Sequence, residues 1–152
     1  SVIVDVSSNS AYALPSIIIP KKAYALADTD ETKFLQKLVK RSMLPKGDYQ
    51  RSGLAYALSK NFVVWYAQKS AFELGSKGIR VVSLSPGLVA TDMGNLEAGE
   101  GAKMLEYGAE RRMGTADELG YAIATVADER NGYLAGVDIL CDGGCTNGKM
   151  FR

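Results

Sequence analysis

The chain has 152 residues, of which 47% are hydrophobic and 23% are charged, and its formal net charge at neutral pH is +1. These values are close to those of ordinary globular domains with one core, and the small net charge argues against nucleic acid or an anionic membrane as a partner. No apolar stretch approaches the ~20 residues that a membrane-spanning helix requires. The absence of histidine excludes Ser-His-Asp or Cys-His catalysis and zinc sites that use histidine.

The two cysteines lie close together near the end of the sequence, at Cys141 and Cys145. Their spacing fits neither a redox-active Cys-x-x-Cys motif nor a four-ligand metal site, so we predict two free thiols and no bound metal. No targeting segment opens the sequence, and we therefore expect a cytoplasmic protein.

The first residues, Ser1–Val6, have the composition of a buried strand. The sequence starts without methionine and directly inside this strand-like run. Because an intact domain rarely begins within a buried element, we expect the chain to be a fragment of a longer domain.

A long excursion, residues 11–51, follows the first strand. Within it Asp30 is placed to cap a helix, and basic residues flank an apolar stripe along that helix. Excursions of this length are usually lids or binding loops. A helix that packs on a neighbouring subunit is a second interpretation, which the pattern leaves open. The apolar stripe consists of Phe34, Leu35, Leu38, Val39 and Met43.

A helix and a strand are predicted next. Ala55–Leu74 contains neither proline nor glycine, places large apolar side chains near helical spacing, and ends at a glycine. Ile79–Leu84 is rich in aliphatic residues and is typical of a strand that is buried on both faces.

The last third of the chain repeats this alternation of helix and strand. Thr115 and Glu118 have the spacing of a capping box, and the helix that they open continues through Val126. Val137–Cys141 is the third predicted strand. Strands that alternate with helices predict an α/β fold with a doubly wound parallel sheet, and three strands are too few to complete such a sheet.

Tyr56 and Lys60 are the first residues that indicate chemistry. Residues four positions apart lie on one face of a helix, so the phenol and the ammonium group can point into the same site. An ordinary tyrosine has a pKa of about 10, and a nearby cation favours its ionised form, which suits such a pair to proton transfer. A single match to this spacing is not rare by chance, so the surrounding motifs decide its meaning.

Hydroxyl side chains follow two of the predicted strands. Ser7 and Ser8 come after the first strand, and Thr91 lies after the second, in a segment that begins with Pro86 and Gly87. In open parallel sheets, ligands bind beyond the carboxyl ends of the strands. A serine hydroxyl there can hydrogen-bond a substrate oxygen, and a Pro-Gly turn can bring backbone close to a flat ring.

The order of these motifs resembles that of the short-chain dehydrogenase/reductase family, whose members have a Rossmann-like fold. The likeness extends from Ser1 to Gly144 and includes a Leu-Ala-Gly-Val-Asp-Ile-Leu-Cys-Asp-Gly-Gly segment at residues 134–144. It implies that residues 1–152 are the carboxyl-terminal part of a single Rossmann-like domain. The family's glycine-rich pyrophosphate turn, its dinucleotide-selecting residue and its helical active-site asparagine would all precede Ser1.

The resemblance also implies a role for each residue of the motifs. Ser8, which we prefer over Ser7, would orient and polarise the substrate oxygen. Tyr56 would transfer the proton, and Lys60 would bind the nicotinamide ribose and favour the ionised phenol. The cofactor would be NAD or NADP, and its nicotinamide carboxamide and nearby phosphate would be held by Pro86, Gly87, Val89 and Thr91.

One departure from the family pattern concerns the spacing of the catalytic motifs. Ser8 and Tyr56 are 48 positions apart, whereas family members commonly have about a dozen residues here. A similar insertion, and the segment Leu54–Asn61, resemble the branch that contains the 3-alpha-hydroxysteroid dehydrogenase/carbonyl reductases. Residues 11–51 would then form a lid on the substrate side, and their apolar stripe suits a hydrophobic ketone or alcohol.

The predicted function is NAD(P)-dependent interconversion of an alcohol and a ketone, with a hydroxysteroid or another hydrophobic carbonyl as the small-molecule substrate. Two alternatives stay open: a family member that acts on a sugar or an acyl thioester, and a catalytically silent member or fragment kept for its subunit interface. The helix with Tyr56 carries aromatic residues on more than one face, among them Trp65 and Tyr66. Because the family's corresponding helix commonly packs in a dimer, we expect a homodimer or homotetramer.

Overall fold

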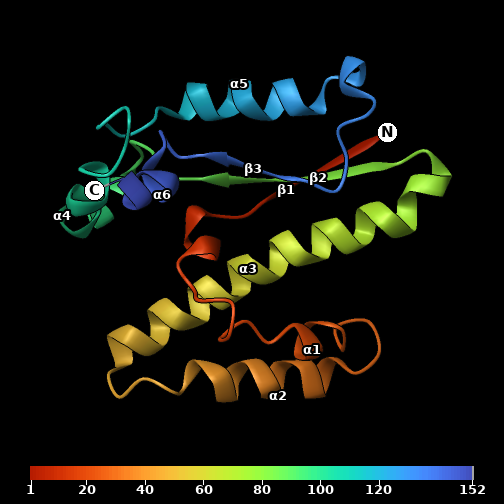
Figure 1. Ribbon diagram of the computed structural model, residues 1–152, viewed down its shortest axis with the longest axis horizontal. Coiled ribbons are helices and arrows are strands. Elements are labelled where there is room, and N and C mark those ends of the chain that lie inside the picture. The colour runs from red at the N-terminus through yellow and green to blue at the C-terminus, as the bar shows by residue number, and fades with distance from the viewer. Residues whose placement is uncertain (152) are drawn as a thin grey trace.

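The protein is built around a parallel sheet of three strands (Figure 1). The computed structural model describes residues 1–151, except for the side chains of residues 93, 95–98, 100 and 102. The strands are β1 (Val2–Val6), β2 (Arg80–Pro86) and β3 (Asp138–Cys141), in the order β1-β2-β3. All three predicted strands are therefore confirmed, and β2 continues two residues beyond the predicted end at Leu84.

The central strand β2 forms the core together with α5 (Ala116–Ala127). Val82 and Leu84 are fully buried on one face of the sheet, where they pack with Val126 of α5. Ser83 and Ser85 are equally buried and alternate with them along the strand. The predicted α/β architecture with a parallel sheet is thus confirmed.

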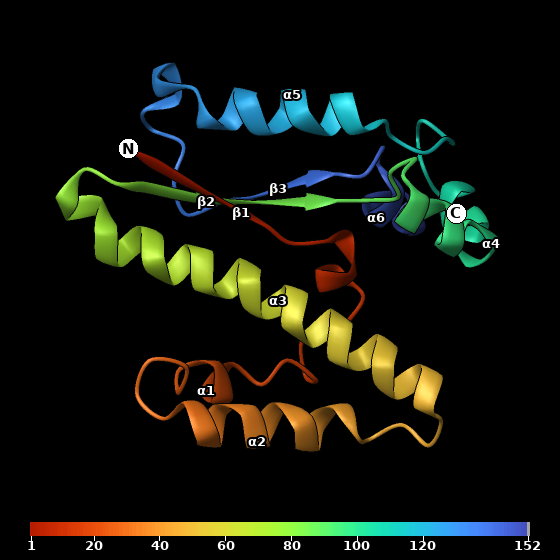
Figure 2. The ribbon, with the colours of Figure 1, turned by 180° about the vertical axis from the view of Figure 1, so that it is seen from behind.

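Helices cover both faces of the sheet, as Figures 1 and 2 show. Helix α5 lies on one face, and the long helix α3 (Asp48–Leu74) crosses the other. The predicted helix start at Ala55 is wrong, because α3 begins at Asp48 and runs through Gly53. A glycine inside a helix costs only about 1 kcal/mol, and packing elsewhere along α3 offsets that cost. The last residues of the predicted excursion therefore belong to α3.

The insertion folds into two helices that lie on the side of α3 away from the sheet (Figures 1 and 2). These are α1 (Lys21–Tyr24) and α2 (Glu31–Ser42), and the Asp30 carboxylate caps α2 by accepting from the Lys33 N–H, as predicted. Of the predicted apolar stripe, only Phe34 is buried. Much of the stripe faces solvent, with Leu35, Val39 and Met43 at least half exposed.

An aromatic cluster joins the insertion to α3. It is centred on the fully buried ring of Tyr24, which lies 5.3 Å from the ring of Phe62 and 5.7 Å from that of Trp65. The cluster consists of Tyr24, Phe34, Phe62, Trp65 and Tyr66. The aromatic residues of α3 on which the expected subunit contact was based thus pack within their own chain, and they no longer support a homodimer or homotetramer.

The remaining elements gather mainly at the two ends of the sheet. Helix α4 (Asp92–Leu105) and α6 (Cys145–Gly148) lie at the carboxyl ends of the strands (Figure 1). The capping box that opens α5 is present as predicted, with both of its hydrogen bonds. Short 3-10 helices are η1 (Asn9–Tyr12), η2 (Gly75–Lys77), η3 (Glu129–Asn131) and η4 (Lys149–Phe151).

No helix in the described part of the chain is long and apolar enough to cross a bilayer. Among the same residues, no three histidine, cysteine, aspartate or glutamate side chains come together as a set of metal ligands. Both Cys141 and Cys145 are free thiols. The cytoplasmic location stays a prediction.

Candidate functional site

A pocket of about 220 Å³ lies where β1 and β2 end, and we call it the strand-end pocket. It contains six of the seven predicted site residues, while Lys60 lies one helical turn beyond Tyr56 and outside the lining. Among the described lining residues, none comes from residues 11–51. The lining consists of Ser7, Ser8, Asn9, Ser10, Tyr56, Pro86, Gly87, Leu88, Val89, Thr91, Gly94 and Met104.

Helix α3 brings Tyr56 and Lys60 to one face, as their spacing requires. The Tyr56 side chain is half exposed, and its hydroxyl has no hydrogen-bond partner among the described residues. The Lys60 Nζ lies 5.7 Å from the centre of the Tyr56 ring and donates to the Val6 carbonyl at 3.4 Å. The ammonium group is therefore tied to the end of β1 and stays beside the phenol.

The two serines after β1 have different surroundings. Ser7 is buried, and its hydroxyl donates to the Lys60 carbonyl at 2.7 Å, so its proton is committed to holding α3 against β1. The Ser8 Oγ caps η1 by accepting from the Ser10 N–H at 3.2 Å. Its own O–H donates to no acceptor in the described part of the chain. This geometry supports the choice of Ser8 as the serine that meets a ligand.

The turn after β2 is held against the loop that follows β3. The Gly87 N–H donates to the Cys141 carbonyl at 3.0 Å. A Cβ at Gly87 would lie 2.6 Å from the Cβ of Asp142, closer than real side chains approach. Glycine is therefore required at this position by the packing of two loops, a reason that the sequence motif did not reveal.

Val89 and Thr91 lie where this turn enters α4. The Val89 N–H has no acceptor among the described residues, which leaves a main-chain donor at the pocket. The Thr91 Oγ1 caps α4 by accepting from the Gly94 N–H at 3.1 Å. A Cβ at Gly94 would overlap the Val89 carbonyl, so only glycine permits this tight first turn.

The hydrogen-bond donors of the strand-end pocket match the needs of a nicotinamide group. A carboxamide and a substrate carbonyl both require hydrogen-bond donors, and donors that are uncommitted within the described chain include the Ser8 hydroxyl, the Tyr56 hydroxyl and the Val89 N–H. Among the described lining residues there is no carboxylate and no cationic side chain, and Leu88 and Met104 add apolar surface. The pocket therefore fits a neutral ring with a carboxamide.

Asn9 is a pocket residue that the sequence analysis did not identify. It is buried, and its amide donates to a carboxylate oxygen of Asp142 at 3.5 Å. Asp142 also accepts from the Gly144 and Thr146 N–H groups, so it organises the loop after β3. The signal was available, because Asn9 directly follows Ser7 and Ser8 at the end of a strand.

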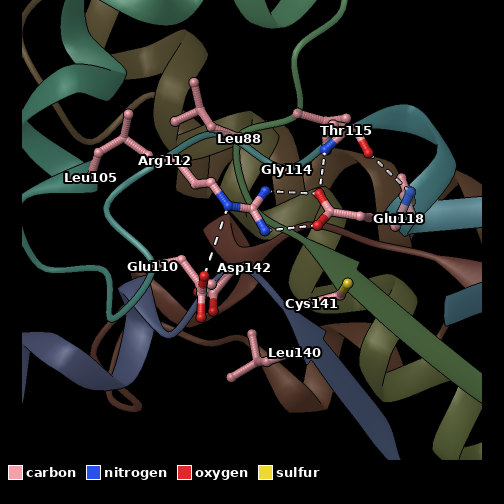
Figure 3. A pocket seen from close by; sticks show the side chains of 13 residues that line it. Leu88, Leu105, Glu110, Arg112, Gly114, Thr115, Glu118, Leu140, Cys141 and Asp142 are labelled. Atoms are coloured by element: carbon pink, nitrogen blue, oxygen red, sulfur yellow. Dashed lines mark hydrogen bonds and ion pairs between the residues drawn. The ribbon is translucent and has the colours of Figure 1, made fainter.

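A second pocket shares Leu88 and Val89 with the strand-end pocket. Figure 3 shows the side chains that line it. Across it the Arg112 guanidinium binds both oxygens of Glu118, at 2.7 and 2.9 Å. Arg112, together with the Thr115 N–H, lowers the pKa of Glu118 to about 2. Both oxygens of Glu118 therefore have hydrogen-bond donors, and the pair holds the start of α5 in place.

The parallel sheet with helices on both faces and a pocket at the carboxyl ends of its strands defines a Rossmann-like α/β protein. A family model described as enoyl-(acyl carrier protein) reductase matches residues 3–146. The chain belongs to the short-chain dehydrogenase/reductase family.

Two curated relatives illustrate the range of this similarity. A 3-oxoacyl-(acyl-carrier-protein) reductase from Buchnera aphidicola is 32% identical over 95 residues, which cover 62% of this chain and 39% of the relative. The 3beta-hydroxysteroid dehydrogenase 2 from Eggerthella lenta is 32% identical over 99 residues, which cover 62% of this chain and 38% of the relative. The matched regions span about two fifths of the length of these relatives.

Solved structures share the fold along almost the whole chain. A short-chain dehydrogenase/reductase from Serratia marcescens superposes with a TM-score of 0.66 and 22% identity, covering 96% of this chain and 46% of that one. ElxO with NADP bound gives 0.62 at 19% identity, and 4-hydroxyisoleucine dehydrogenase complexed with NADH gives 0.61 at 20% identity. Each of these two matches covers 97% of this chain and 47% of the other.

Proposed function

We propose that the protein is an NAD(P)-dependent oxidoreductase that interconverts an alcohol and a ketone, with Ser8, Tyr56 and Lys60 as its catalytic residues. The observation that carries this proposal is the strand-end pocket itself. There the free hydroxyls of Ser8 and Tyr56 face one cavity, and the Lys60 ammonium group lies 5.7 Å from the centre of the Tyr56 ring. Family membership supports the same conclusion.

Each side chain has a role that its surroundings permit. The Ser8 O–H would donate to the substrate oxygen and polarise the carbonyl, because its proton has no other acceptor in the described chain. The Tyr56 hydroxyl would give its proton to the same oxygen as the alcohol forms, and would take it back in the reverse direction. Lys60 would stabilise the negative charge that then develops on the phenol oxygen.

A nicotinamide cofactor would supply or accept the hydride. Pro86, Gly87, Val89 and Thr91 would hold its carboxamide and nearby phosphate, and the uncommitted Val89 N–H would donate to the carboxamide. Both NAD and NADP stay in the proposal, since the neighbouring structures include one with NADP and one with NADH.

For the substrate we propose a hydrophobic carbonyl compound or the corresponding alcohol, such as a hydroxysteroid. Leu88 and Met104 give the pocket an apolar side, and one relative is a hydroxysteroid dehydrogenase. The second candidate is an acyl thioester, because another relative is a 3-oxoacyl-(acyl-carrier-protein) reductase. None of the described residues that line the strand-end pocket comes from residues 11–51. These residues can therefore act as the proposed lid only for a substrate that extends beyond this pocket.

The test is the change in nicotinamide absorbance on mixing the complete protein with NADH or NADPH and either a ketosteroid or a 3-oxoacyl thioester. Tyr56→Phe should reduce turnover by about 100-fold or more. The matched control is Tyr121→Phe, which removes the hydroxyl of an exposed tyrosine on α5 and should leave turnover unchanged. Equal activity of the Tyr56 variant and the control would refute the proposed catalytic role.

Homo-oligomerisation is proposed on family grounds alone, as a dimer or tetramer. Light scattering on the complete protein should give a mass of two or four chains, and a monomeric mass would disprove it.

A further inference from the structure

A groove of about 560 Å³ separates residues 19–23 from the carboxyl-terminal half of α2, and we call it the basic groove. It lies within the insertion and shares no residue with the strand-end pocket. Its lining alternates aliphatic surface with cations: Ile19, Pro20, Lys21, Lys22, Ala23, Lys37, Lys40, Arg41 and Leu44.

The charge of the chain is distributed unevenly around this groove. Residues 17–46 carry seven lysines and arginines against three acids, whereas the rest of the chain carries eleven against fourteen. A net charge of +1 therefore hides a segment of +4 attached to a remainder of −3. The total charge argues against polyanionic partners, but its uneven distribution leaves one local surface positive.

The cations of the groove are not neutralised by the protein itself. Lys21, Lys22, Lys37 and Lys40 make no ion pair among the described residues. Two acids of the insertion are committed elsewhere. Asp28 pairs with Lys69 of α3 at 2.7 Å, and Asp30 caps α2. Glu31, the third acid of residues 17–46, makes no ion pair among the described residues, so no acid of this segment pairs with a cation of the groove.

The groove is held open by contacts that do not depend on a ligand. Arg41 joins its two walls, because its guanidinium donates from α2 to the carbonyls of Ile18 and Ile17 at 3.0 and 3.4 Å. The buried Tyr24 anchors the other wall by donating to the Leu58 carbonyl of α3 at 3.1 Å. A preformed site of this kind binds without a large cost for ordering its own walls.

We propose that the basic groove docks an acidic amphipathic helix of a partner protein. The apolar lining residues, which include Ile19, Ala23 and Leu44, would take the helix's apolar face, and cations on both walls would meet its acidic flanks. A lone carboxylate would engage one or two of the lysines. A nucleic acid has no apolar face for these apolar residues, and a flat bilayer surface does not enter a concave groove.

The experiment titrates the full chain into a fluorescently labelled synthetic helix of leucine, alanine and glutamate, and follows anisotropy. Lys37→Glu/Lys40→Glu and Lys21→Glu/Lys22→Glu should each weaken binding roughly tenfold or more. Leu44→Glu should also weaken binding, because it replaces an apolar lining residue with a negative charge that repels the acidic helix. The control Lys77→Glu reverses an exposed lysine in η2 that lies outside the groove, and it should change the affinity less than about twofold.

Unchanged circular dichroism and thermal unfolding of the variants would exclude misfolding as the cause of any loss. Three results would overturn the proposal: no binding of the acidic helix, equal binding of a scrambled peptide with the same composition, or stronger binding to anionic phospholipid vesicles or duplex DNA. The assay uses no cofactor, so its outcome is independent of whether the oxidoreductase activity is found.

Discussion

The strand-end pocket and the aromatic cluster lie at different positions along α3, and they differ in whether their polar groups have hydrogen-bond partners. In the cluster, the Tyr24 hydroxyl reaches both the Leu58 carbonyl and the Asn61 side chain, and the Asn61 amide in turn donates to the Ala11 carbonyl at 2.9 Å. In the pocket, by contrast, the Ser8 and Tyr56 hydroxyls keep protons that no described residue accepts. Helix α3 therefore stabilises the fold where it packs in the cluster, and where it lines the pocket it carries a hydroxyl that donates to no described residue.

This difference separates two kinds of mutational effect. Where every polar group has a partner, a substitution leaves a buried group without one, and the cost appears in the free energy of unfolding. Where a hydroxyl is uncommitted, its loss changes little in the free protein and appears only when a ligand needs the proton. The predictions below test that separation, from the largest expected effect to the smallest.

Tyr24→Ala should cause the largest loss of stability, about 3–5 kcal/mol, because it empties the centre of the aromatic cluster. Tyr24→Phe keeps the ring but removes the O–H that the Leu58 carbonyl and the Asn61 oxygen accept, at a cost of about 1–2 kcal/mol. Urea unfolding followed by circular dichroism measures both. If the two variants were equally stable, the cluster would not anchor the insertion.

Ser8→Ala and Ser7→Ala form a pair that contrasts activity with stability. Ser8→Ala should lower kcat/KM about 100-fold, and the loss of its cap on the Ser10 N–H should cost no more than about 1 kcal/mol of stability. Ser7→Ala should cost about 1 kcal/mol of stability and less than about tenfold in activity, because its hydroxyl holds the Lys60 carbonyl. The opposite pattern would identify Ser7 as the serine that meets the substrate.

Features that depend on local patterns could be predicted from the sequence. Strands and capped helices depend on local patterns, so the three strands, the Asp30 cap and the Thr115 capping box were found in advance. Motif spacing also identified residues that the fold brings to one pocket. These features need only the residues within a few positions of one another.

Features set by distant contacts were missed. The role of Gly87 depends on Asp142, and neither residue reveals the other in the sequence. The start of α3 at Asp48 depends on the packing that compensates Gly53. The basic groove escaped notice because its two walls are separated in sequence and its charge disappears in the total for the chain.

The alkaline limit of stability gives a finer test of the aromatic cluster. Burial raises the pKa of Tyr24 to about 12, above the ordinary value of 10.0. Because the unfolded chain releases this proton first, the contribution is complete below pH 10 and is lost as the pH rises towards about 12. Wild type should therefore lose about 2 kcal/mol more than Tyr24→Phe over this interval. Urea unfolding of both proteins at several alkaline pH values measures the difference, and parallel losses would contradict it.

The smallest effect is expected at Glu118. Its carboxylate has hydrogen-bond partners, like the polar groups of the cluster, but it lies in contact with solvent. Arg112 and the Thr115 N–H hold its pKa at about 2, below the ordinary 4.5, so the stabilising contribution is present above pH 4.5 and is lost as the pH falls towards 2. Glu118→Gln has no carboxylate to protonate and should lack this loss. Because the Arg112–Glu118 pair is exposed and screened by salt, the difference in thermal unfolding between the two proteins should be small, and it should shrink further at high ionic strength. A large difference that salt does not change would mean that hydrogen bonding at the start of α5, rather than charge, supplies the stability.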